Sequence, residues 1–243
     1  MGILDVLNPN KTNNKYLKDA KIKDYNFESI FAVALGRSIA VQQAIAEKVI
    51  RNRNWKIDLI NGVINFGEDS FPIQFLGSKS DADNTFLWGW KNINNFPNSM
   101  IALPEKIRKY GEAYKIDVLR NANVELNRKV SEYSLAIVAS MIGEDVGYYR
   151  CPYEGGAAFI AISGLPKEVF DPVDEQRFID ILLKCLNSNY EFDQKLFVES
   201  FLMWNNTAYR WDGNTLIAKF KTRVEVEFNK TSKGLRVKNI IKE

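Results

Sequence analysis

The feature that most constrains the fold is the segment of residues 75–92, FLGSKSDADNTFLWGWKN, in which an acidic polar loop leads into two closely spaced tryptophans. Trp88 and Trp90 are two positions apart, so in a β-strand both indole rings would lie on one face of the sheet. Leu87 and Gly89 would lie on the other face. Rings in a row are typical of a sheet face covered by helices, although they also form platforms for a base, a sugar or a peptide. The segment therefore predicts a helix-covered sheet, with a ligand-binding face as the alternative.

Composition and charge set broad limits on the class of protein. The 243 residues are 46% hydrophobic, which suffices for one large domain or two small ones. The 33 Lys and Arg residues nearly balance the 30 Asp and Glu residues, so a net charge of +3 gives no electrostatic reason to expect nucleic acid binding. We expect a cytoplasmic location and no transmembrane segment, because neither a spanning apolar run nor a secretory leader is evident. A weak membrane contact through the apolar residues 3–7 is an alternative.

The sequence contains no histidine. This excludes Ser-His and Cys-His nucleophile pairs, most zinc hydrolase sites and the usual general base near neutral pH. The two cysteines, Cys151 and Cys185, are too few for a disulfide framework or a four-ligand zinc site. We expect neither a metal nor a cofactor, and any catalysis would depend on carboxylates, lysine, tyrosine or an oxygen-ligated metal.

Apolar periodicity and turn residues predict an α+β fold with antiparallel β-meanders packed against helices. The helices are expected at residues 27–49, from Pro104 onward, and at 131–142, 173–187 and 193–204. The strands are expected at residues 55–59, 63–66, 71–76, 85–91, 146–151, 157–162, 207–211, 215–220, 222–228 and 234–241.

Three regions follow from this pattern. They are a flexible N-terminal arm at residues 1–26, a main α+β unit at 27–164 and a smaller helix-helix-meander unit at 165–243. Gly164 and Pro166 interrupt the periodicity between the last two regions.

An internal duplication is an alternative explanation of the two units. Shifting the sequence by 151 positions aligns Asn61-Gly62, a favoured hairpin turn, with Asp212-Gly213. A chance match explains this alignment at least as well as a duplication, because unrelated units made of helices followed by a meander also share a glycine in the turn.

Two motifs stand out for their spacing. The first runs from Leu-Gly-Ser through the polar loop to TFLWGWKN at residues 76–92, and the second is GYYRCPYEGGAAF at residues 147–159. Together they resemble an uncharacterised bacterial family known only as a domain of unknown function, and the resemblance covers most of residues 27–163. The first stretch of that family typically ends Thr-Trp-x-Trp-x-Trp-x-Asn, and Phe86 replaces the first tryptophan here. The resemblance implies fold and site location, and it carries no activity.

The polar loop before the tryptophans is the first candidate site. It presents Asp81, Asp83 and Asn84, and alternate carboxylates can ligate Ca²⁺ or Mg²⁺ through oxygen. A metal loop usually needs more ligands and a glycine at its sharp turn, whereas Asp and Asn are also the residues that turns prefer. The favoured interpretation of this segment is a solvated hairpin loop that binds no metal. If the loop is a binding site, Trp88 and Trp90 are its aromatic part.

The YYRCPYEGG hairpin is the second candidate site. Arg150 and Glu154 flank a turn, with Tyr149 and Tyr153 close in sequence. An arginine framed by tyrosines suits a carboxylate or phosphate, because the planar guanidinium binds such groups through two hydrogen bonds. An ion pair between Arg150 and Glu154 at the hairpin end is the simpler interpretation.

These patterns predict a non-catalytic binding or interaction protein whose partner is another protein. The family resemblance implies the more specific role, an accessory or immunity component of a bacterial defence or toxin system. The first alternative is a hydrolase that uses carboxylates among Asp81, Asp83, Glu144 and Asp145, with Arg150 binding an anionic substrate. The second is a small-ligand sensor with a pocket between sheet and helices, and a small anionic ligand is an alternative partner. An open pocket joining the Asp81 loop to Arg150 and Glu144 would favour the hydrolase.

Overall fold

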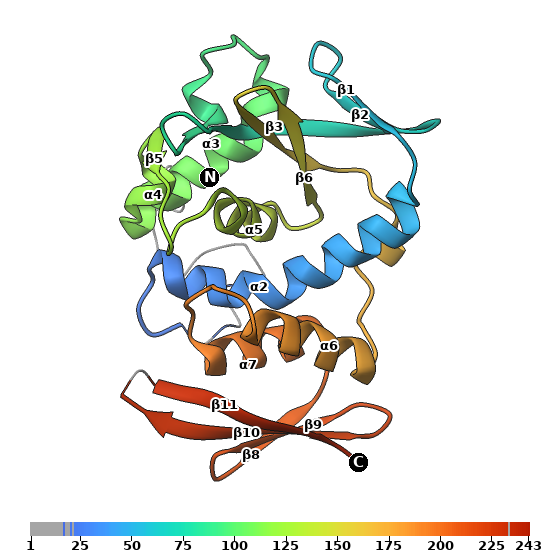
Figure 1. The fold of residues 1–243 in the computed structure, drawn as a ribbon, viewed down its shortest axis with the longest axis vertical. Helices are drawn as coiled ribbons and strands as arrows, with labels where there is room; N and C mark the ends of the chain where they lie inside the picture. The colour runs from blue at the N-terminus through green and yellow to red at the C-terminus, as the bar shows by residue number, and fades with distance from the viewer. Residues whose placement is uncertain (1–16, 18–19, 21, 233) are drawn as a thin grey trace, which may run out of the picture. The chain divides into compact units, whose positions relative to one another are not determined.

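The computed structural model describes residues 17, 20, 22–232 and 234–243, and this part of the chain has an α+β fold (Figure 1). It contains six α-helices and two antiparallel sheets, and one sheet is curled into a half-barrel. The predicted fold class, antiparallel meanders packed against helices, is confirmed. Most of the predicted N-terminal arm, including apolar residues 3–7, lies outside the described residues.

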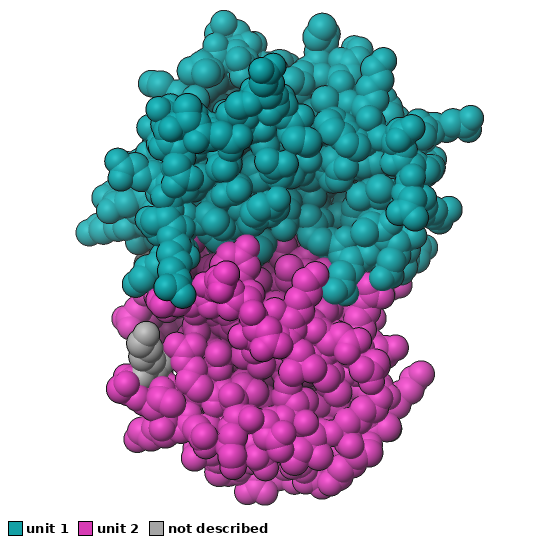
Figure 2. All heavy atoms as spheres, in the orientation of Figure 1, with its two compact units in different colours: residues 1–12, 41–170 teal, residues 13–40, 171–243 magenta. Residues whose placement is uncertain are grey.

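The contacts within the chain define two compact units, which Figure 2 shows in different colours. Unit 1 comprises residues 1–12 and 41–170, and unit 2 comprises residues 13–40 and 171–243.

Helix α2 (Phe27–Ala44) runs on into a π-helical segment, Ile45–Ile50, close to the helix predicted at residues 27–49. In unit 2 its Phe31 ring packs edge-on against Tyr190, with the ring centroids 5.0 Å apart. Gly36 lies so close to Phe201 that an added methyl group would be 2.4 Å from that ring. These contacts group the first part of α2 with the C-terminal residues, whereas the predicted division groups it with the main unit.

The same helix also meets the length and composition expected of a membrane span, although the sequence pattern predicted no transmembrane segment. Of its most apolar 18-residue window, 67% is buried within the protein. Such burial is the usual state of a core helix, because its apolar surface already has protein neighbours.

The strands of unit 1 form a seven-stranded sheet. They are β1 (Trp55–Asp58), β2 (Val63–Phe66), β3 (Asp69–Ser80), β4 (Thr85–Trp88), β5 (Asn123–Glu125), β6 (Gly147–Tyr153) and β7 (Gly156–Ile162). The strand order is β1-β2-β3-β4-β5, and β7 pairs with both β3 and β6.

Strand β3 organises this sheet because it pairs with three neighbours. Residues 69–72 pair with β2, residues 77–80 pair with β4, and residues 73–80 pair with β7. The register with β7 shifts between Phe75 and Gly77, which leaves Leu76 as an extra residue. Such a bulge bends a strand and increases its twist, so it favours the curl of the sheet.

Three helices complete unit 1: α3 (Asn98–Tyr114), α4 (Asp117–Arg120) and α5 (Glu132–Gly143). Helix α3 begins at Asn98, so the start predicted at Pro104 is wrong. Pro104 lies inside the helix, where it cannot donate a backbone hydrogen bond. The preceding amide, on Leu103, donates to Gln74 Oε1 of β3 at 2.6 Å, which ties the helix to the sheet next to Pro104.

Unit 2 places two helices with a four-stranded meander, as predicted from the C-terminal third. The elements are α6 (Glu175–Leu186), α7 (Gln194–Trp204), β8 (Tyr209–Asp212), β9 (Thr215–Lys219), β10 (Arg223–Thr231) and β11 (Gly234–Lys242). Alternate residues of β10, Val224, Val226 and Phe228, are buried. Phe178 of α6 lies 4.9 Å from the Phe201 ring of α7, so aromatic packing joins these elements into one core.

We predict that Gly89→Ala lowers the free energy of unfolding by about 3 kcal/mol, because inserted atoms strain a close-packed core. A methyl group there would lie 2.0 Å from the carbonyl oxygen of Phe75. Gly155→Ala is the matched control, since its φ of +81° is strained for alanine but the space around it is open. That variant should lose only about 1 kcal/mol. Urea denaturation measures both losses, and equal losses would contradict the close packing at Gly89.

Candidate functional site

Trp88, the first aromatic residue of the candidate site, belongs to the core of unit 1. It is 1% exposed, and its ring lies 5.1 Å from the ring of Phe86. Phe86 in turn packs against Phe159 of β7 at 5.9 Å. The indole Nε1 of Trp88 donates a hydrogen bond to the backbone oxygen of Val118 at 2.8 Å. This side chain therefore joins β4 to helix α4, in agreement with the core interpretation.

Trp90 does not share a strand face with Trp88, so the prediction that both rings lie on one face is wrong. Strand β4 ends at Trp88, and Gly89–Lys91 form a 3₁₀ turn closed by Asn92 at a φ of +48°. The close approach of Gly89 to the backbone of β3 accompanies this departure from strand geometry. The guanidinium of Arg108 lies 5.7 Å from the Trp90 ring centroid. The Trp90 Nε1 is buried without a hydrogen-bond partner among the described residues.

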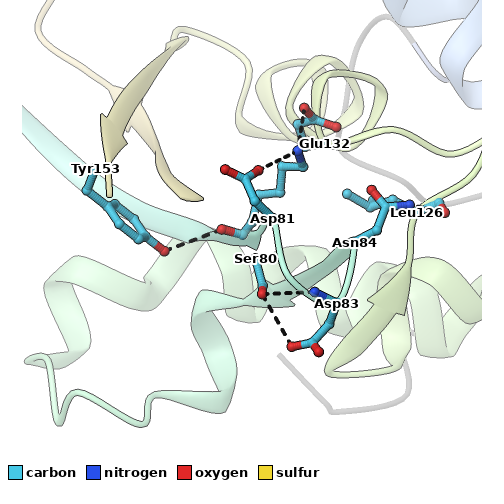
Figure 3. Close-up of polar contacts among 8 residues, drawn as sticks. Ser80, Asp81, Asp83, Asn84, Leu126, Glu132 and Tyr153 are labelled. Carbon is cyan, nitrogen blue, oxygen red and sulfur yellow. Dashed lines mark hydrogen bonds and ion pairs between the residues drawn. The ribbon is translucent and has the colours of Figure 1, made fainter. Parts of the chain in front are cut away.

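The polar loop after β3 and the turn between β6 and β7 meet at one end of the unit 1 sheet (Figure 3). The Asp81 amide donates to the backbone oxygen of Gly155 at 3.0 Å. The Tyr153 hydroxyl lies 3.4 Å from the backbone oxygen of Lys79, to which it donates. Both tips are exposed. We call the exposed side chains of Asp81, Asp83, Tyr153 and Glu154 the tip surface.

A small charge network lies beneath the tip surface. The Lys79 Nζ is 2.7 Å from Asp81 Oδ1 and 4.0 Å from Glu132 Oε1 at the start of α5. The hydrogen bond from Lys79 lowers the pKa of Asp81, and the same bond raises the pKa of Lys79. The positive charge of Arg150 also acts to lower both pKa values. Asp81 is therefore held as a carboxylate, which suits binding better than proton transfer near neutral pH.

The other two polar residues of the loop have different roles. Asn84 adopts a φ of +49°, and its side-chain amide donates to the backbone oxygen of Leu126 at 2.9 Å. This hydrogen bond fixes the end of the loop against the chain that follows β5. The backbone amide of Asp83 donates to the Ser80 hydroxyl at 3.4 Å, and its carboxylate accepts from that hydroxyl at 3.3 Å. Asp83 thus stays at the solvent-exposed tip, whereas Asn84 stabilises the turn.

Strand β6 separates Arg150 from the tyrosines that were expected to frame it. Successive side chains alternate between faces, so Tyr149 and Tyr153 share one face and Arg150 lies on the other. The Tyr149 ring packs against Trp55 and Phe66, at 5.7 Å and 5.3 Å. The expectation of an arginine framed by tyrosines is therefore wrong, and the reason is the period of two.

Arg150 also lacks the ion pair expected with Glu154. No ion pair joins these two residues within the described structure, although a three- or four-residue spacing favours one in a helix. Arg150 lies inside β6 and Glu154 lies in the turn after it, so the extended chain from Arg150 to the strand end at Tyr153 already spans about 10 Å. The Nε of Arg150 is buried and has no hydrogen-bond partner among the described residues.

The carboxylates of the hydrolase alternative are not gathered together. Glu144 is the C-terminal cap of α5 and, with Asp145, precedes the first residue of β6. The Asp81 loop meets the far end of that strand, roughly 20 Å away at the rise of a β-strand. Within the described residues, no group of three or more His, Cys, Asp or Glu side chains is placed to hold a metal ion.

Both cysteines are buried, and burial raises the pKa of each thiol to about 12. Cys151 lies on β6 and Cys185 on α6. Strand β6 extends to Tyr153, so Cys151 lies inside the strand and is 4% exposed. A thiolate is the reactive form of cysteine, so neither side chain is prepared to act as a nucleophile near neutral pH.

Sequence reasoning missed Lys79 and Glu132, which position Asp81. Lys79 is only two residues from Asp81, at the end of the strand that leads into the loop, and this short separation of opposite charges was a usable signal. Glu132 comes from a distant helix, and no local pattern indicates its approach to the loop.

Comparison with known proteins places the chain in a family. Residues 28–165, more than half of the chain, match the family of unknown function DUF6882, and the chain belongs to this family. The resemblance inferred from the two motifs, to a domain of unknown function, is thereby confirmed. Neither curated proteins nor solved structures provided a match.

The two tryptophans provide a matched test of the core assignment. We predict that Trp88→Phe lowers the free energy of unfolding by about 2–4 kcal/mol, because it leaves the Val118 oxygen without its donor and opens a cavity. Trp90→Phe should change it by less than about 1 kcal/mol, because it removes a buried N–H that has no partner among the described residues. Urea denaturation measures both variants, and a larger loss for Trp90→Phe would contradict the assignment.

The cysteines give a second test. We expect neither Cys151 nor Cys185 to react with Ellman's reagent at pH 8 in the folded protein, because the thiols are buried and protonated. Both should react at once in denaturing urea. Rapid reaction of either thiol in the native protein would show that a thiolate is accessible.

Proposed function

We propose that this chain is a non-catalytic, cytoplasmic binding protein that docks another protein on the tip surface of unit 1. The observation that carries the proposal is the hydrogen bond between the Asp81 amide and the Gly155 oxygen, which holds the two exposed tips together. Binding surfaces that are already ordered lose less conformational entropy on association.

The chemistry of the tip surface favours a partner with a basic face. Asp81, Asp83 and Glu154 supply negative charge, and Tyr153 remains 53% exposed. The tyrosine ring is held over Gly156, where an added methyl group would lie 3.0 Å from the hydroxyl. Tyrosine is frequent among the residues that dominate interface energies, and acidic residues around it would steer a basic partner.

The distribution of reactive groups also supports a binding role over the hydrolase. Glu144 and Asp145 lie at the opposite end of β6 from Asp81, and the two thiols have pKa values of about 12. General acid and base groups need to approach the same reacting atom. The more specific role, an accessory or immunity component in bacterial defence or toxin systems, stays a prediction from sequence resemblance.

Photo-crosslinking in cells of the source organism tests the proposal. A p-benzoylphenylalanine residue replaces Tyr153 in one variant and Ile60 in a control, since Ile60 is 93% exposed in the β1–β2 turn of the same unit. We expect one protein to crosslink at position 153 and not at position 60, because only the former lies on the tip surface. Mass spectrometry identifies that protein.

The captured protein is then purified and titrated against the natural chain. We expect Tyr153→Ser to weaken binding at least about tenfold, in the range for a central interface aromatic, and Ile60→Ser to leave it unchanged. Equal affinities of the natural chain and Tyr153→Ser would overturn the proposed docking surface. Hydrolysis of the captured protein by the purified chain would overturn the non-catalytic assignment.

A further inference from the structure

Unit 2 contains an open groove at the end of its meander, where β8 begins and β9 turns into β10. The groove has a volume of about 530 Å³. Its lining residues all come from the meander and the turn, and they are Ala208, Tyr209, Arg210, Ile217, Ala218 and the run 219–223. This volume is within the range of small-molecule sites, roughly 300–1,000 Å³.

The lining of the groove is positively charged. It includes Arg210, Lys219, Lys221 and Arg223, and it includes no Asp or Glu. Lys219 and Lys221 form no ion pair with any residue that the structure describes. The groove thus presents two lysines without ion pairs among the described residues, whereas Arg210 lies 4.0 Å from Asp212 Oδ2.

Two of these cations are directly opposite each other across neighbouring strands. Lys219 of β9 pairs in register with Arg223 of β10. Like charges in this position destabilise a sheet. Arg223 is compensated in part by ion pairs with Glu225 and, at 3.6 Å, with Glu243. Lys219 forms no ion pair with any described residue, so its repulsion from Arg223 persists in the folded protein. A bound anion would reduce that repulsion.

The groove also has apolar and hydrogen-bonding parts. Arg210 is opposite Ile217 in the β8–β9 register, and Ile217 shares a sheet face with Lys219. The Phe220 ring packs on Phe178 at 5.1 Å, which fixes one wall. The hydroxyl of Thr222 is buried without a hydrogen-bond partner among the described residues, although buried polar groups are nearly always satisfied.

We propose that this groove binds a small organic anion, with a carboxylate or phosphate held by Lys219 and Arg210 and an apolar body against Ile217. The site is separate from the tip surface and does not depend on the proposed docking function. The neighbouring charges favour a small ligand over a polyanion. Glu225 pairs with Ile217 across the strands, and Glu227 and Asp212 both pair with Thr215, two residues before Ile217. These three carboxylates share the sheet face of Ile217, so they would repel a nucleic acid strand that crossed the sheet.

Titration of the full chain with two probes, phenyl phosphate and phenylacetate, tests the site by amide NMR. We expect at least one probe to saturate with a Kd of about 1 mM or tighter, with shifts confined to residues 208–223. Lys219→Gln should weaken binding of that probe at least tenfold, whereas Lys230→Gln, an exposed lysine outside the groove, should leave it unchanged. Which probe binds distinguishes a phosphate from a carboxylate ligand.

Stability supplies an independent readout. Lys219→Gln should raise the melting temperature or leave it unchanged, because it removes the repulsion with Arg223. Failure of both probes to saturate the groove, or equal binding to the natural chain and Lys219→Gln, would overturn the proposal. Tighter binding of a single-stranded oligonucleotide at the same residues would also overturn it in favour of a nucleic acid site.

Discussion

The close approach of Gly89, the residue directly after β4, to strand β3 is the constraint on which unit 1 depends. The Cα of Gly89 leaves no room for a side chain beside the Phe75 oxygen, and β3 carries its extra residue, Leu76, at the same point. The second half of β3 pairs with both β4 and β7, and the bulge curves the sheet at the start of this double pairing. That double pairing brings the Asp81 loop to the Gly155 turn. The tip surface is thus a consequence of backbone packing several residues away.

Periodicity and turn chemistry were enough to predict most of the fold. Turn residues between short apolar or aromatic runs located β6 and β7, alternating apolar residues located the C-terminal meander, and helical spacing located α2, α5, α6 and α7. The start of α3 was missed because a proline was read as the beginning of the helix, whereas Pro104 lies inside it, next to the Leu103 amide that donates to Gln74 of β3. No local pattern could reveal that contact between a helix and a distant strand.

The sequence predicted which residues form the candidate site better than it predicted how those residues are arranged in space. Both polar tips were identified from sequence, but only the β3–β7 pairing shows that they meet. The alternation of side chains along a strand is by itself enough to separate Arg150 from Tyr149. The environment of Trp90 could not be predicted, because the end of β4 depends on how closely two backbones approach. The groove of unit 2 likewise depends on cross-strand register, which places Lys219 opposite Arg223.

Amide hydrogen exchange at Asp81 tests most directly the claim that the two tips form one fixed surface. The Asp81 amide donates to Gly155 across the gap between hairpins, and no regular strand pairing among the described residues protects it. We predict exchange nearly as slow as that of the neighbouring β3 amides, because the hydrogen bond opens only when the sheet does. Exchange at the rate of a free loop amide would contradict the claim, since the tips would then move independently.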